Sequence, residues 1–73
     1  MEDKHRNYAL KIGKLIQERR QKKRWTAAEF GEKIGYSESY ISKIESGNSL
    51  ATTRFLIEVA ELFDIQLSTL LRG

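Results

Sequence analysis

Two short helix patterns joined by three residues constrain the fold of this chain more than any other feature. The patterns cover about residues 27–34 and 38–46, and only residues 35–37 connect them. So short a connection forces the two helices to cross steeply, which is a helix-turn-helix arrangement. Gly35 can adopt a positive φ in the turn, and Gly31 places a hydrogen atom where a larger side chain would push the helices apart.

Capping residues mark the ends of both helices. Thr26 and Glu29 have the T-x-x-E spacing of a capping box at the start of the first one. Ser37 can cap the start of the second, and Gly47 suits the left-handed residue that ends a helix. We therefore expect both helices to have well-defined boundaries.

Three further helix patterns complete the chain, at about residues 8–23, 53–63 and 67–71, with apolar residues at helical spacing. No strand pattern competes with them, and 73 residues are expected to form one domain. The sequence predicts an all-α fold, a compact five-helix bundle that contains a helix-turn-helix. Residues 1–7 are expected to be a flexible polar segment, and residues 8–73 the helix-turn-helix domain.

Composition excludes several classes of site. The chain has no cysteine, which excludes a disulfide scaffold and a thiolate zinc site, and its single histidine, His5, lies in the polar N-terminal segment. Without clustered carboxylates or a positioned nucleophile, we expect neither an enzyme nor a cofactor, and no small-molecule ligand is evident. No stretch approaches the roughly 20 apolar residues of a membrane span, and the N-terminus lacks an apolar signal region. We expect a cytoplasmic protein with no membrane partner.

The net charge of +3 is unevenly distributed along the chain. Residues 1–24 contain nine Lys and Arg and three acids, whereas residues 25–73 contain four Lys and Arg and seven acids. This asymmetry fits an anionic partner, and it equally fits a solvated first helix.

The helix at 38–46 has two different sides. At about 100° per residue, Ile41 and Ile44 fall together on the side that must face the preceding helix. The opposite arc of roughly 140° carries short or polar residues, namely Glu38, Ser39, Ser42, Lys43 and Ser46. Serines are mediocre helix formers, but short polar side chains allow a second surface to come close. This arc fits a DNA major groove, whose base edges offer donors and acceptors; the alternative is a solvated face.

The run WTAAEFGEKIGYSESYISKIESGNS resembles the core of the XRE helix-turn-helix family, the Cro and lambda-repressor type. The similarity covers about residues 10–71. The matching positions occur in order and at the family's spacing: Ile12-Gly13, Ile16, Arg20, Thr26, Glu29, Gly31, Ile34-Gly35, Ser37, Ile41 to Glu45, Gly47, Ala60 and Leu70-Leu71. The resemblance implies a five-helix, lambda-repressor-like fold that binds double-stranded DNA at bacterial, plasmid or phage promoters as a dimer.

The resemblance also assigns roles to single residues. Arg20 and Glu45 match an internal ion pair of the family, the alternative being two separate surface charges. The candidate base contacts are Ser37, Glu38, Ser39, Ser42 and Lys43. Lys43 can reach guanine and Glu38 can accept from cytosine N4, although Glu38 equally suits the helix dipole.

The candidate phosphate contacts are Arg24, Thr26, Ala27, Tyr40, Asn48, Ser49, Thr52 and Arg54. Ala27 replaces the glutamine that the family usually has there, so that only backbone N–H groups remain for a phosphate. Arg24 stands where the family often has a glycine that closes the first helix, and it is interpreted as a phosphate contact. Asn48 and Ser49 are also ordinary loop-forming residues.

More apolar residues occur in the C-terminal half than so small a core can take. We predict a dimer interface formed by Phe55, Leu62, Leu67 and Leu71, the alternative being scattered surface residues. The predicted function is a sequence-specific transcriptional regulator, a repressor, that inserts helix 38–46 into the major groove of a near-palindromic operator as a homodimer. The alternative is a protein-interaction module, such as an antitoxin or anti-repressor, whose main partner is another protein.

Overall fold

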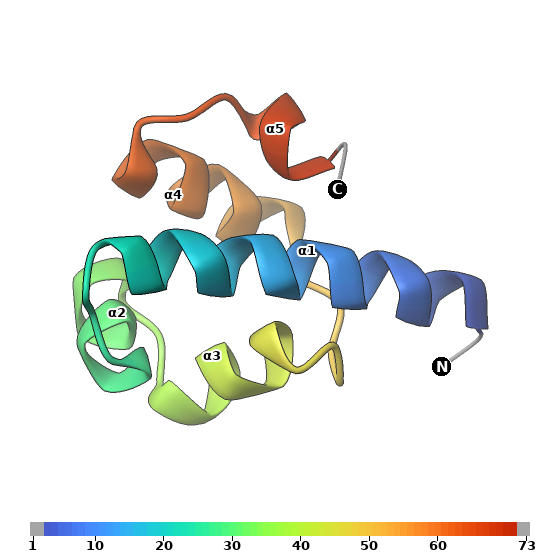
Figure 1. The fold of residues 1–73 in the computed structure, drawn as a ribbon, viewed down its shortest axis with the longest axis horizontal. Helices are drawn as coiled ribbons and strands as arrows, with labels where there is room; N and C mark the ends of the chain where they lie inside the picture. Colours follow the sequence, from blue (N-terminus) through green and yellow to red (C-terminus); the bar gives the residue numbers. More distant parts are fainter. Residues whose placement is uncertain (1–2, 72–73) are drawn as a thin grey trace.

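The computed structural model describes residues 3–71, and every regular element within that range is an α-helix. The helices are α1 (Asp3–Lys22), α2 (Ala27–Ile34), α3 (Glu38–Glu45), α4 (Thr53–Phe63) and α5 (Leu67–Leu71). In Figure 1, α1 runs across the molecule, with α2 and α3 on one side and α4 and α5 on the other. The predicted all-α architecture of five helices is confirmed.

The first helix starts earlier than the sequence predicted. It begins at Asp3 rather than at residue 8, so residues 3–7 of the expected flexible segment are helical instead. The prediction was wrong because it started the helix at the first apolar residue. Residues 3–7 contain neither glycine nor proline, so nothing stops the helix from continuing toward the N-terminus. This end of α1 projects beyond the other helices (Figure 1).

All five helices contribute fully buried side chains to one core. These are Ile16, Phe30, Ile41, Ile44, Phe55, Val59 and Leu70. Trp25, which follows α1, covers one edge of this core. Its ring stacks on Phe30 and Phe63, with centroids 6.4 and 5.8 Å apart. Burial of these apolar and aromatic side chains is the main force that holds the short helices together.

The turn between α2 and α3 has the features that the sequence predicted. Gly35 has φ +86°, and its N–H donates to the Gly31 carbonyl at 2.8 Å. A Cβ atom on Gly31 would lie 2.5 Å from the Tyr36 carbonyl oxygen. A side chain at position 31 would therefore force the two helices apart, and the steep crossing requires glycine there.

Phe55 lies in the core and not on the surface, which corrects its predicted place in a dimer interface. Its side chain has no solvent exposure. The rings of Tyr36 and Tyr40 stack with centroids 5.0 Å apart, and both meet Phe55 edge-on at 4.9 and 5.1 Å. Edge-to-face contacts between aromatic rings stabilise a fold beyond the burial of their apolar area. They place the side of α4 that carries Phe55 against the start of α3.

Candidate nucleic-acid interface

The two sides of α3 are separated as the sequence predicted. Ile41 and Ile44 are buried against the core. The candidate base-contacting residues on the other side are all exposed, namely Ser37, Glu38, Ser39, Ser42 and Lys43. The outer face of α3 therefore presents three hydroxyls, one acid and one base to the solvent.

Both ends of α3 are capped by short polar residues. The Ser37 hydroxyl accepts a hydrogen bond from the Tyr40 N–H at 3.1 Å, which leaves its proton free to donate elsewhere. At the other end, Gly47 has φ +78° and donates to the Ile44 carbonyl, while the Asn48 N–H donates to Lys43 at 3.0 Å. This pair of bonds is a Schellman motif. It orders the first residues of the loop that contains the candidate phosphate contacts Asn48 and Ser49.

Arg20 and Glu45 form an ion pair that attaches the end of α3 to α1. Arg20 donates from Nε and from one terminal nitrogen to the two Glu45 oxygens, at 2.7 and 2.9 Å. Its other terminal nitrogen donates to the Trp25 carbonyl at 2.7 Å. The two side chains are only 12% and 6% exposed. The hydrogen bond to Glu45 raises the pKa of Arg20, and neither charge is available to DNA.

The start of α2 is closed by the predicted capping box. Thr26 accepts from the Glu29 N–H at 3.1 Å, and its own N–H donates to the Glu29 carboxylate at 2.9 Å. These bonds with Thr26 lower the pKa of Glu29. The N–H groups of residues 27 and 28 have no partner within the helix, as in the first turn of any helix. Just before this turn, the exposed Arg24 has φ +60°.

The start of α4 carries a network that the sequence analysis missed. Thr52 caps the helix by accepting from the Phe55 N–H at 3.1 Å. Arg54 Nε lies 3.3 Å from Glu58 Oε1, and the Tyr36 hydroxyl donates to the same oxygen at 3.0 Å. The i,i+4 spacing of Arg54 and Glu58 could have indicated the ion pair. No local signal connects Tyr36 to a residue 22 positions away.

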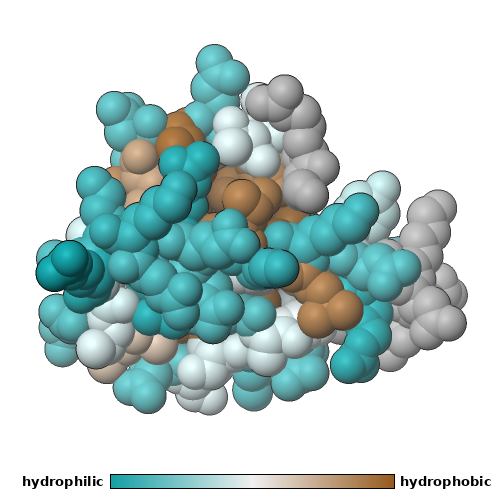
Figure 2. Space-filling model, in the orientation of Figure 1, coloured by the Kyte–Doolittle hydropathy of each residue, from teal (hydrophilic) through white to brown (hydrophobic). Residues whose placement is uncertain are grey.

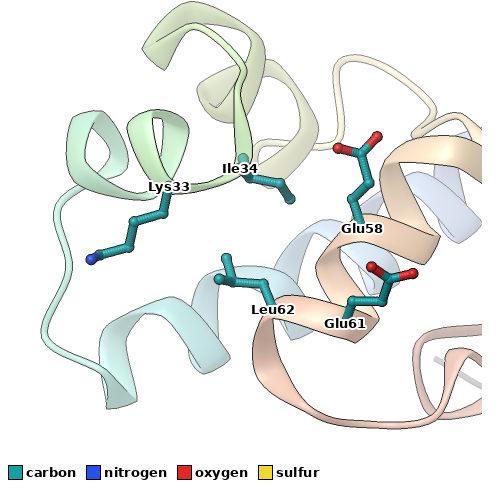
Figure 3. A pocket seen from close by; sticks show the side chains of 5 residues that line it. All are labelled: Lys33, Ile34, Glu58, Glu61 and Leu62. Carbon is teal, nitrogen blue, oxygen red and sulfur yellow. The ribbon is translucent and has the colours of Figure 1, made fainter.

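The dimer candidates differ in how far they are exposed. Besides the buried Phe55, Leu62 and Leu67 are half-buried against the core, and only Leu71 is largely exposed, at 52%. Leu62 lines a hollow between α2 and α4 (Figure 3), together with Lys33, Ile34, Glu58 and Glu61. Figure 2 shows a mainly hydrophilic face with small, separate apolar areas. The other large exposed apolar side chains are Tyr8, Leu10, Leu50 and Ile57.

Within residues 3–71, no group of three or more His, Asp or Glu side chains has the arrangement of a metal site. None of the helices in that range is both long and apolar enough to cross a membrane.

Comparison with known proteins identifies the family. The sequence pattern of the helix-turn-helix family matches residues 16–70, which is more than half of the chain. The chain belongs to the XRE-type helix-turn-helix family. Its sequence is also similar to the "ImmF control region 10 kDa protein" of Bacillus phage phi105, with 35% identity over 60 residues. Those residues cover 82% of this chain and 67% of the phage protein. No solved structure is significantly similar to the chain.

Membership in the XRE-type family points to a non-enzymatic, DNA-binding regulator of transcription. The matched range includes α2, the turn and α3.

Proposed function

We propose that this protein is an operator-binding repressor that places α3 in the major groove as a homodimer. The observation that carries the proposal is the division of α3 into a fully buried apolar side and an exposed side of short polar residues. A major groove about 12 Å wide admits a helix whose outer side chains are short.

The base-reading part of the proposal rests on the chemistry of the exposed residues. Ser39 and Ser42 can donate or accept, and Lys43 can reach guanine O6 or N7. Glu38 can accept from cytosine N4. Ser37 stays available as a donor because its cap uses only a lone pair. These five residues are proposed to read sequence, whereas phosphate contacts fix position.

The proposed phosphate contacts come from three helix starts and one loop. Arg24, Thr26 and the N–H of Ala27 lie at the start of α2, and Tyr40 lies in α3. Asn48 and Ser49 follow α3, while Thr52 and Arg54 lie at the start of α4. Helix starts favour phosphate because their free N–H groups point outward. Thr26 and Thr52 use their side-chain oxygens as caps, so their proposed contacts depend on donation by the hydroxyl proton.

Repression is proposed rather than activation because it requires fewer interaction surfaces on the protein. A repressor needs only to occupy DNA tightly and selectively, whereas an activator also needs a surface that contacts the transcription machinery. The phage protein with 35% identity is named for a control region, which supports a regulatory role for this chain.

The proposed homodimer uses the α4 and α5 side of the molecule. Ile57 and Leu71 are 42% and 52% exposed there, and the half-buried Leu62 and Leu67 can extend the contact. A two-fold dimer presents the same patch on both subunits. It would place two copies of α3 about 34 Å apart, one turn of DNA, and therefore requires a near-palindromic operator.

Selection of binding sites from random duplex DNA, followed by affinity measurements, tests the DNA-binding proposal. Ser39→Ala and Lys43→Ala should each weaken binding to the selected site by about 1–3 kcal/mol and affect random DNA less. Lys11→Ala is the matched control, because this exposed lysine lies about 160° around α1 from Gly13, which faces α3. Unchanged site preference in both α3 variants would refute the assignment of α3. Binding that does not weaken with salt would refute the contribution of phosphate contacts.

Sedimentation of the free protein at micromolar concentration tests the dimer. The wild type should sediment as a dimer, and Ile57→Glu and Leu71→Glu should sediment as monomers. Leu50→Glu is the matched control, since Leu50 is also exposed but lies in the loop before α4. A wild-type monomer that binds a single half-site would contradict the dimer. A dimer that survives both charges would place the interface on another surface.

A further inference from the structure

The Glu58 carboxylate on α4 has two partners of different kinds. Its Oε1 atom accepts from the Tyr36 hydroxyl at 3.0 Å and lies 3.3 Å from Arg54 Nε. The Arg54 side chain is 88% exposed, whereas that of Glu58 is 33% exposed. One oxygen thus serves a fixed partner from the helix-turn-helix and a solvated partner from its own helix.

The two partners differ in how easily they can leave. Tyr36 is held by stacking on Tyr40 and by its edge contact with Phe55, so the hydroxyl cannot move without disturbing the core. Burial, together with the hydrogen bond to Glu58, raises the pKa of Tyr36 further above its ordinary value of about 10, so the hydroxyl is protonated and donates at neutral pH. Within residues 3–71, the Arg54 side chain makes no hydrogen bond or ion pair other than its contact with Glu58. If Arg54 swings away, Glu58 still has a hydrogen-bond donor.

We propose that Glu58 is an internal competitor for Arg54, which limits the contact of this guanidinium with DNA phosphates outside the operator. The inference rests on the proposed function, because it requires α3 to dock on DNA with Arg54 facing a phosphate. The Arg54 guanidinium makes a single contact of 3.3 Å with Glu58 and is 88% exposed, whereas a well-aligned phosphate can accept two short, charge-assisted hydrogen bonds from it. A well-aligned operator phosphate therefore displaces Glu58.

On DNA whose phosphates are poorly aligned, the competition between phosphate and Glu58 for Arg54 has the opposite outcome. Phosphate contacts supply essentially all of the affinity for non-specific sites. A loosely placed phosphate at longer range competes poorly with a carboxylate 3.3 Å away, so Arg54 remains with Glu58. Glu58 consequently lowers non-specific affinity more than operator affinity. Specificity for the operator then arises because Glu58 weakens binding to other DNA sequences.

Glu58→Gln is the test variant, because its amide oxygen still accepts from Tyr36 while the charge is removed. Affinities for the selected operator and for random duplex are measured by fluorescence anisotropy at low and at physiological salt. Random-duplex affinity should rise about two- to five-fold at low salt, the range expected from an exposed ion pair. Operator affinity should rise less. In an Arg54→Ala background the gain should disappear.

Glu61→Gln is the matched control. It removes the same charge from an exposed position on α4, three residues farther from Arg54. An equal gain in Glu61→Gln, or a gain that persists with Arg54→Ala, would overturn the inference, because general repulsion would then explain it. Unchanged or weaker binding by Glu58→Gln would also overturn it. If the wild type binds neither DNA, the proposed function itself fails, and that result is distinct from the other outcomes.

Discussion

Removal of the Glu45 carboxylate should destabilise the domain strongly. In Glu45→Ala, Arg20 loses both bonds to the carboxylate and keeps only the bond to the Trp25 carbonyl. Removing one partner of a buried ion pair costs about 3–5 kcal/mol. We expect about 3 kcal/mol, the lower end of this range, because Arg20 is 12% exposed and retains one acceptor.

The expected loss is large for a domain of this size. Domains are stable by roughly 0.05–0.15 kcal/mol per residue, which gives about 4–11 kcal/mol for 73 residues. A loss of 3 kcal/mol corresponds to a fall in Tm of about 12–24 °C, at about 4–8 °C per kcal/mol. Urea unfolding measures the loss in free energy and thermal unfolding measures the fall in Tm, each followed by circular dichroism and by the fluorescence of the single tryptophan, Trp25.

A double-mutant cycle separates the ion pair from other effects of the substitution. Arg20→Ala with Glu45→Ala should be at least about 1 kcal/mol more stable than the sum of the single losses predicts. Glu32→Ala is the matched control on an exposed carboxylate of α2, and it should change stability by less than about 0.5 kcal/mol. If Glu45→Ala unfolds within about 0.5 kcal/mol of the wild type, the pair does not stabilise the attachment of α3 to α1.

Three further substitutions test other features. Gly13→Ala would place a Cβ atom against the Ile44 carbonyl oxygen. Overpacking of this kind should lower the free energy of unfolding, measured in urea, by about 1–3 kcal/mol. If the variant is as stable as the wild type, α1 and α3 can separate freely. Arg24→Gly should raise the free energy of unfolding by about 1 kcal/mol, because glycine adopts the positive φ without strain. Its affinity for DNA should fall if Arg24 contacts phosphate. Asp64→Gly, at φ +55°, is the control that should leave DNA binding unchanged. Folding lowers the pKa of Glu29 from its ordinary value of 4.5. The stability that Glu29 contributes is therefore fully present above pH 4.5 and is lost as the pH falls through the lower pKa of the folded state. Glu29→Gln should flatten this acid limb of stability, and an identical pH profile would show that the capping carboxylate does not contribute.

Helix positions could be predicted from the sequence wherever a local signal exists. The boundaries of α2, α4 and α5 agree with the predicted ranges, and α3 ends one residue early because Ser46 is its cap. Capping boxes, left-handed glycines and apolar periodicity act over three or four residues, so each can be recognised within its own segment. The pairing of Arg20 with Glu45 came instead from the resemblance to a known family.

The contacts of the aromatic residues could not be predicted in the same way. Periodicity placed Phe55 beside the apolar stripe of α4, and its burial depends on Tyr36 and Tyr40 from another part of the chain. The same arrangement brings Tyr36 to Glu58. Leu62 was predicted as an interface residue because the C-terminal half has more apolar residues than the core can take, and in the structure it lines the hollow beside α2. Spacing within one helix does not reveal which neighbouring helix covers each side.

These long-range contacts determine how rigidly α3 is presented. At its C-terminal end the helix is attached to α1 by Arg20 and Glu45, and at its N-terminal end Tyr36 and Tyr40 pack on Phe55 of α4. A helix attached only at one end would lose conformational freedom on binding, and this loss weakens association. Because both ends of α3 are fixed before any partner arrives, its exposed residues can meet a partner with little further ordering. Substitutions at either attachment should therefore weaken a proposed operator complex even though none of these residues is expected to read a base.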